Sequence, residues 1–244
     1  MPALTTSLLE REKPLSETIE RYAKLFDIDP NVVRGLMTQE SAFIAEATSP
    51  TGAFGYGQFT GIGAKQVYQN ISKMDRRAAD LVDFRKSRAS EPDIGIKAIC
   101  ATLWWLYHVK YKNVEDKVVR LEATLTFYNA GGKPAALVVR HEGHANAVPF
   151  IKQLPKKYQS QAGHYAPQVA AWYLKWHEHY KVVAPPAPAP APVLEDDSPE
   201  IDAKYKALVE SLKLLANADE MVDVLIDSRD DLTEVTLILP GEYQ

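Results

Sequence analysis

One glutamate, Glu40, carries the chemistry that the sequence suggests, and it lies at the end of a predicted helix. Asp29 is a good N-cap for that helix, and Pro30 fits its first position. Val32, Leu36 and Glu40 are spaced i, i+4 and i+8, so the carboxyl continues an apolar stripe. Burial of the Glu40 carboxyl would disfavour its charged form and raise its pKa. A general acid needs a raised pKa to hold its proton near neutral pH. The alternative is a helix-end glutamate turned to solvent, as most glutamates are.

Three sequence blocks accompany this residue. The first runs through Glu40-Ser41-x-Phe43, Ala47-x-Ser49 and Gly52-Ala53-x-Gly55 to Gln58. The other two are Phe127-Tyr128-Asn129-Ala130-Gly131 and Tyr165-Ala166-Pro167-Gln168-Val169. In this order, over roughly residues 15 to 180, they resemble the motifs of the soluble lytic transglycosylases, lysozyme-like enzymes that cleave peptidoglycan.

The resemblance has two departures. This chain has Gly55-Tyr56-Gly57-Gln58 where the family usually has Gly-Leu-Met-Gln, a difference that concerns one wall of a sugar subsite. It also has Ala166 where valine is usual.

The resemblance implies a reaction that needs one carboxyl. Glu40 would protonate the β-1,4 oxygen between N-acetylmuramic acid and N-acetylglucosamine, and then act as a base while a 1,6-anhydro ring closes. A glycosidase that uses water or a covalent intermediate usually needs two carboxylates. The candidates for a second one, Glu46 and Asp93, lie outside the motif positions that the family uses for catalysis.

The resemblance also implies substrate contacts for five residues. Ser41 would steady the Glu40 region or contact the N-acetyl group, and Tyr165 would lie close to Glu40 and orient that group. Hydrogen bonds to the sugars would come from Gln58, Tyr128 and Asn129. The structural alternatives are packing roles for the two tyrosines and a helix-cap role for Asn129.

The apolar periodicity predicts a mainly α protein, in keeping with the goose-lysozyme/transglycosylase type of fold that the resemblance implies. Helices are expected over residues 15–26, 30–40, 60–70, 92–111, 114–128, 133–140 and 163–180. Residues 44–60 predict a small irregular hairpin, residues 71–91 a solvated helix and loop, and residues 141–162 an irregular segment.

Four regions follow from these patterns. Residues 1–14 are expected to be a mobile N-terminal arm, and residues 15–181 the catalytic domain. Residues 182–199 are a Pro/Ala-rich linker that favours extended polyproline II. Residues 200–244 are expected to form a small acidic α+β module, with a helix near 198–216 and strands near 221–226 and 234–240. So small a module suggests self-association or docking on a partner, with a loosely ordered tail as the alternative.

Charge and composition narrow the function classes. Residues from Val182 onward carry 14 acidic side chains against 4 basic ones, so the rest of the chain is basic overall and suits an anionic polymer such as peptidoglycan. The sequence has no basic run of the kind that would predict nucleic acid as a partner. It also has no run of 18 apolar residues, so no membrane span is expected. Cys100 is the only cysteine, which excludes an internal disulfide.

Other catalytic chemistries find little support in the sequence. The close histidine pairs are His141-x-x-His144 and His177-x-His179, neither with the HExxH spacing, so no metal or cofactor is expected. The sequence contains no G-x-S-x-G motif, so a serine nucleophile is not expected. The alternatives to a transglycosylase are a hydrolytic lysozyme of the same fold and a non-catalytic wall-binding or virion assembly protein.

The N-terminus lacks the basic-then-apolar pattern of a secretory signal. We therefore expect synthesis in the cytoplasm and action on the periplasmic cell wall. That combination suggests a bacteriophage product, either an endolysin released through a holin or a virion component. The C-terminal module would then bind a virion partner, and a bacterial secretion-system enzyme is the alternative.

Overall fold

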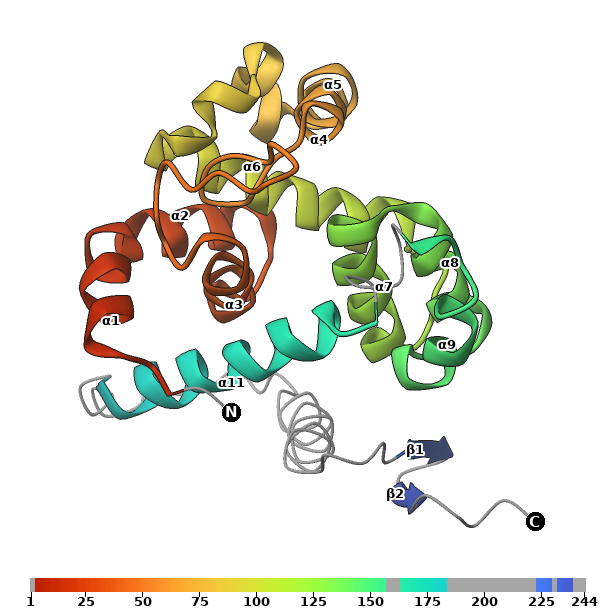
Figure 1. Ribbon diagram of the computed structural model, residues 1–244. Helices are drawn as coiled ribbons and strands as arrows, with labels where there is room; N and C mark the ends of the chain where they lie inside the picture. Colours follow the sequence, from red (N-terminus) through yellow and green to blue (C-terminus); the bar gives the residue numbers. More distant parts are fainter. Residues whose placement is uncertain (1–2, 157–162, 184–222, 230–231, 239–244) are drawn as a thin grey trace, which may run out of the picture. The chain divides into compact units, whose positions relative to one another are not determined.

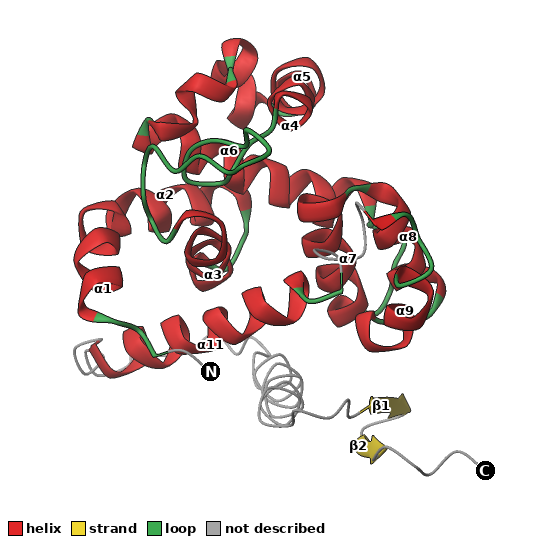
Figure 2. Cartoon of the chain, in the orientation of Figure 1, coloured by secondary structure: helices red, strands yellow, loops and turns green. Residues whose placement is uncertain are grey.

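The computed structural model describes residues 3–156, 163–183, 223–229 and 232–238. The chain divides into two compact units, one covering Ala3–Trp176 and the other including the chain from His177 onward. Figure 1 follows the elements along the chain, and Figure 2 shows that helices joined by loops make up the described part of the first unit. The prediction of a mainly α protein is confirmed.

The helices of the described residues are α1 (Thr6–Glu12), α2 (Ser16–Phe26), α3 (Pro30–Ser41), α4 (Gly61–Gln66), α5 (Ser72–Met74), α6 (Pro92–Trp104), α7 (Lys117–Ala130), α8 (Gly132–Arg140), α9 (His144–Ile151) and α11 (Tyr165–Val183). Short 3-10 helices cover Lys13–Leu15, Arg76–Asp83 and Lys86–Ser90. Wider π-type turns extend α4 and α6 over Val67–Ile71 and Trp105–Lys110. None of the described helices is both long enough and apolar enough to cross a membrane.

Helix α3 begins as the sequence predicts. The side chain of Asp29 accepts a hydrogen bond from the backbone N–H of Asn31 at 2.7 Å, and Pro30 takes the first helical position. The helix ends at Ser41, and Ala42 then adopts a left-handed φ of 49°. Because most of its residues are buried, α3 is a central element of the first unit rather than a surface helix.

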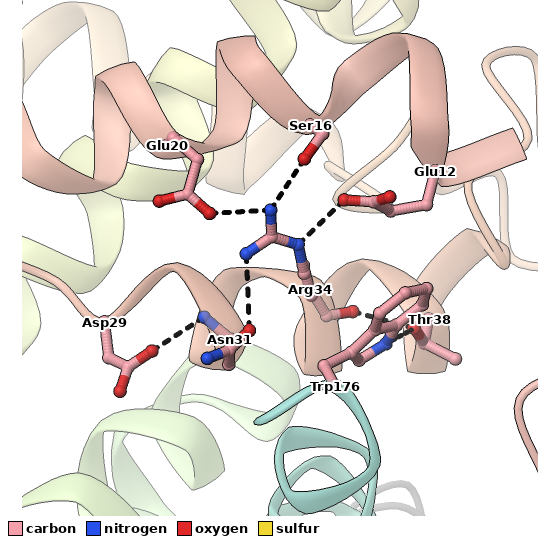
Figure 3. A network of polar contacts seen from close by, with 8 residues as sticks. All are labelled: Glu12, Ser16, Glu20, Asp29, Asn31, Arg34, Thr38 and Trp176. Carbon is pink, nitrogen blue, oxygen red and sulfur yellow. Dashed lines mark hydrogen bonds and ion pairs between the residues drawn. The ribbon is translucent and has the colours of Figure 1, made fainter. Parts of the chain in front are cut away.

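A buried arginine ties α3 to the helices before it (Figure 3). The Arg34 side chain is 1% exposed; its Nε donates to Oε1 of Glu12 at 2.7 Å, and Nη2 lies 2.7 Å from Oε1 of Glu20. Nη2 also donates to Oγ of Ser16 at 2.9 Å, and Nη1 to Oδ1 of Asn31 at 3.3 Å. A desolvated guanidinium needs such compensation, so these contacts fix α3 against α1 and α2.

The expectation of a mobile arm over residues 1–14 is therefore wrong for the described part of that range, residues 3–14. Thr5 caps α1 by accepting from the backbone N–H of Leu8 at 3.3 Å, and Leu8 and Glu12 are buried. The stabilising partner, Arg34, lies 22 residues further along the chain from Glu12. A local sequence pattern carries no information about such a distant partner.

Helix α11 packs against α3. A Cβ atom at Gly35 would lie 2.8 Å from the carbonyl oxygen of Val169 and 2.9 Å from the backbone nitrogen of Tyr173, so only glycine permits this approach. The buried indole of Trp176 donates to Oγ1 of Thr38 at 2.8 Å (Figure 3). These contacts set the course of α11 along the helix that carries Glu40.

An apolar cluster joins α7, α8 and α9. Its buried members are Val119, Ala123, Val138, Ala147 and Ile151. The expectation that residues 141–162 are irregular is wrong where α9 forms, even though Pro149 lies inside this helix. The helix is held by packing on α7 and α8, which the local sequence does not reveal.

The described part of the second unit beyond α11 is an antiparallel pair of strands. Strand β1 (Asp223–Arg229) pairs with β2 (Leu232–Ile238), in a register that sets Asp223 opposite Ile238. The strands start or end a few residues from the predicted bounds. The expected helix near 198–216 and the linker beyond residue 183 lie outside the described residues.

Candidate active site

The carboxyl of Glu40 lies at the last turn of α3 and is half-buried. Its Oε1 accepts a short hydrogen bond from the hydroxyl of Tyr165, the first residue of α11. Loss of water around the carboxyl raises the pKa of Glu40 to about 7, and the hydrogen bond from Tyr165 opposes this rise. Near neutral pH such a group is well suited to give a proton and to take one back.

Tyr165 lies next to Glu40, as the resemblance to the transglycosylases implied. Its side chain is buried, and burial together with the nearby Glu40 carboxyl raises the pKa of the phenol well above its usual range. The phenol therefore stays protonated and keeps its role as hydrogen-bond donor.

Tyr128, on α7, faces the loop that follows α3. Its hydroxyl donates to the carbonyl oxygen of Gly57 at 2.9 Å. Burial raises the pKa of Tyr128, and the charge of Glu40 is the next contribution, so the phenol lies within electrostatic reach of that carboxyl. A Cβ atom at Gly57 would lie 2.5 Å from the Tyr128 hydroxyl and 2.6 Å from Cγ1 of Ile99. This crowding leaves room for no side chain larger than that of glycine at position 57.

Ser41 is buried and joins the end of α3 to the loop. Its hydroxyl lies 2.9 Å from the carbonyl oxygen of Tyr56 and 3.2 Å from that of Met37. Of the two roles expected for Ser41, these contacts favour steadying the region of Glu40.

Gln58 has a structural role that the sequence did not predict. It adopts a left-handed φ of 48°, and its Nε2 donates to the carbonyl oxygens of Ala47 at 2.8 Å and of Gly55 at 3.0 Å. Both amide protons therefore hold the loop together. Only Oε1 remains to accept a hydrogen bond from a sugar, which narrows the substrate contact expected of Gln58.

Asn129 is not the cap that ends α7. That position belongs to Gly131, which has a φ of 80° and whose N–H donates to the carbonyl oxygen of Phe127 at 2.8 Å. The buried Oδ1 of Asn129 has no hydrogen-bond partner among the described residues. Such an acceptor is costly to leave unpaired, so a bound sugar hydroxyl or amide would stabilise it.

Neither of the other acidic residues considered as a second carboxylate joins Glu40. Glu46 is exposed, while Asp93 accepts a short hydrogen bond from Arg21 and a longer one, at 3.4 Å, from the hydroxyl of Tyr22. Within the described residues, no second carboxylate contributes to the raised pKa of Glu40. The same residues contain no group of three or more His, Cys, Asp or Glu side chains that could hold a metal ion.

The sequence analysis did not identify the residues that hold Glu40 and Tyr128 in position. Arg34 and Trp176 fix α3, and Gly57 makes room for Tyr128. A charged residue within the apolar run of α3 was a signal for Arg34. The departure from the family pattern at Gly55-Tyr56-Gly57-Gln58 was a signal for Gly57, but the contacts that require glycine there come from Tyr128 and Ile99, which are distant in the sequence.

A model of the transglycosylase SLT domain family matches residues 17–151. The match covers more than half of the chain and includes Glu40, Ser41, Gln58, Tyr128 and Asn129, while Tyr165 lies beyond its end. A comparison with curated proteins finds no match. The chain therefore belongs to the SLT transglycosylase family and contains its mainly helical, lysozyme-like domain.

Proposed function

We propose that this protein is a lytic transglycosylase that cleaves the β-1,4 bond between N-acetylmuramic acid and N-acetylglucosamine in peptidoglycan. The observation that carries the proposal is the Glu40 carboxyl, half-buried, with a pKa raised to about 7 by burial. Its hydrogen-bond partner is a phenol, Tyr165, rather than a cation that would hold it ionised.

In the first step, protonated Glu40 gives its proton to the glycosidic oxygen as the bond from that oxygen to C1 of the muramic residue breaks. The carbonyl oxygen of the muramic N-acetyl group assists at C1. In the second step, the C6 hydroxyl attacks C1 and passes its proton to the Glu40 carboxylate. The 1,6-anhydro ring closes without consuming water, and Glu40 returns to its starting form.

The neighbouring side chains support these two proton transfers. The Tyr165 hydroxyl orients the carboxyl and helps to stabilise its ionised form between the steps. Ser41 and Gln58 fix the loop after α3, and Tyr128 fixes the same loop from α7. We assign sugar contacts to Oε1 of Gln58 and to the amide of Asn129.

The test is a digestion of purified peptidoglycan with analysis of the muropeptides by mass spectrometry. The wild type is compared with Glu40→Gln and with Glu122→Gln. Glu122 is a matched control, because burial also raises its pKa to about 7, yet its carboxyl accepts from the backbone N–H of His144 on α9.

The proposal expects products that end in 1,6-anhydromuramic acid from the wild type and from Glu122→Gln, and none from Glu40→Gln. Reducing-end products from the wild type would identify a hydrolytic lysozyme instead. Binding to peptidoglycan without cleavage, by a correctly folded wild type, would identify a wall-binding or assembly protein.

The biological setting stays a prediction. We propose action on the periplasmic cell wall as a phage endolysin or virion component, with residues 200–244 serving self-association or a virion partner. The acidic composition of that region and its antiparallel strand pair support a docking role.

A further inference from the structure

We propose that His144 is a positioning residue for this reaction, because it fixes the backbone at Gly163 and thereby sets where the Tyr165 hydroxyl meets Glu40. The inference rests on the proposed function and extends it to a residue outside the three sequence blocks. It comes from a set of hydrogen bonds that links α7, α9 and the start of α11.

His144 is the first residue of α9 and is 3% exposed. Its ring Nε2 lies 3.1 Å from the carbonyl oxygen of Gly163, and its Nδ1 lies 3.5 Å from Oγ1 of Thr126 on α7. Its backbone N–H donates to Oε2 of Glu122 at 2.8 Å. The ring is thus held between two elements, and its backbone is fixed by a third contact.

The chemistry of these partners selects one form of the ring. A carbonyl oxygen can only accept a hydrogen bond, so Nε2 carries the proton. In a neutral ring Nδ1 is then the acceptor, and the Thr126 hydroxyl donates to it. Burial lowers the pKa of His144 and the nearby His164 lowers it further, while the bond to Gly163 opposes these effects. The ring therefore stays neutral near pH 7, beside the Glu122 carboxyl at the helix start.

The two histidines of the His141–His144 segment have different ring contacts. The ring of His141 stacks on Phe150, with centroids 3.8 Å apart and an angle of 8° between the planes. Both ring nitrogens of His144 face protein partners.

The link to the reaction runs through two residues of chain. Gly163 is followed by His164, whose carbonyl oxygen accepts from the backbone N–H of Gln168, and then by Tyr165. A displacement at Gly163 would therefore move the phenol that hydrogen-bonds to Glu40. Small displacements of orienting groups cost large factors in rate, so a bond at this point controls turnover without contacting substrate.

The test compares two substitutions of the same residue. His144→Leu removes the donor, while the amide nitrogen of His144→Gln can still donate to the Gly163 carbonyl. On soluble, uncrosslinked glycan strands we expect His144→Leu to lower kcat about tenfold with KM unchanged, and His144→Gln to recover most of that loss. Equal losses in the two variants, or no loss in either, would overturn the proposal.

A second readout does not depend on turnover. The carboxyl titration of Glu40 can be followed by carbon NMR and assigned by its absence in Glu40→Gln. The Tyr165 bond lowers the pKa of Glu40, so His144→Leu should raise that pKa and His144→Gln should leave it near the wild-type value. An unchanged titration in a folded His144→Leu protein would contradict the proposal. This readout also decides the matter if the wild type proves not to cleave peptidoglycan.

A third measurement uses the unaltered protein, in case His144→Leu does not fold. Nitrogen NMR distinguishes the two neutral tautomers of histidine from each other and from the charged ring. We expect the His144 ring to be neutral and protonated at Nε2 at pH 7. A proton on Nδ1, or a charged ring, would remove the bond to Gly163 that the proposal requires.

Discussion

Two half-buried carboxyls in this protein, Glu40 and Glu122, have the same raised pKa of about 7 for the same first cause, burial. Their partners differ. Glu122 accepts from the backbone N–H of His144 and so caps α9, whereas Glu40 accepts from the side chain of Tyr165. A shifted pKa therefore marks both a structural cap and a candidate acid. The partner and the neighbouring motif residues separate the two cases.

The most direct test of the different roles of Glu40 and Glu122 is to make the same substitution at both positions. Glu40→Gln removes the proton donor and should lower the rate of glycan cleavage by about 10³-fold. Glu122→Gln keeps an acceptor for the His144 N–H and should lower it less than about threefold. Rates come from the release of soluble muropeptides at pH 7. A comparable loss in both variants would remove the distinction.

Removing the phenol that distinguishes Glu40 should have the next largest effect. Tyr165→Phe is expected to lower the cleavage rate by about 10 to 100-fold, the range for a hydrogen bond to a charged group. Because that bond lowers the pKa of Glu40, its loss should shift the pH–rate profile to higher pH. Tyr22→Phe is the matched control, since the Tyr22 hydroxyl also faces a carboxylate, Asp93, but at the surface. A profile that moves to lower pH would contradict this assignment.

The raised pKa that Glu40 and Glu122 share should make the free energy of unfolding depend on pH. Each pKa is higher in the folded protein than the value of 4.5 expected when unfolded, so the folded state binds more protons between about pH 4.5 and 7. Stability from these groups is full below that window and is lost as the pH rises through it, by on the order of 1–3 kcal/mol each.

This loss can be measured from urea unfolding at pH 5 and pH 8. Glu40→Gln and Glu122→Gln should each reduce the difference between the two pH values relative to the wild type. Since other groups titrate in the same range, the comparison of variant with wild type is the informative quantity. A variant that leaves the difference unchanged would show that its carboxyl has an ordinary pKa.

The smallest expected effect on the cleavage rate, among the substitutions at the site, concerns the loop that follows α3. Gly57→Ala would place a Cβ atom 2.5 Å from the Tyr128 hydroxyl, so the ring or the loop must shift, at a cost of about 1–3 kcal/mol in unfolding free energy. Cleavage should fall by about tenfold. Gly61→Ala is the control, because nothing lies within 4 Å of a Cβ atom there. If Gly57→Ala and Gly61→Ala had the same unfolding free energy and cleavage rate, the loop would accommodate the added methyl group without cost, contrary to this prediction.

The sequence predicted the features that depend on neighbouring residues. Asp29 and Pro30 at the start of α3 and the glycine turn after α7 follow from capping chemistry, and the structure has them. The resemblance to the transglycosylases implied that Tyr165 would lie near Glu40, and the structure has the two in contact although 125 residues separate them.

What the sequence did not predict depends on contacts that form only in the folded chain. Helix α1 is held by Glu12 against Arg34, and α9 forms around an internal proline because it packs on α7 and α8. Gln58 looked like a sugar ligand, yet its amide protons bind the loop. For α1 and α9 the deciding contacts join residues that no local pattern relates, whereas the Gln58 contacts lie within one loop and depend on its folded course.

The buried guanidinium of Arg34 also determines which N-terminal boundary a stable, truncated domain can have. The family match begins at residue 17, after Glu12 and Ser16, which both bind this side chain. A protein trimmed to that start would keep the buried cation and lose two of its partners, a change that typically costs about 3–5 kcal/mol when a buried ion pair is broken. For expression or for fusion to another protein, the domain therefore has to begin before α1, well upstream of the similarity that identifies it.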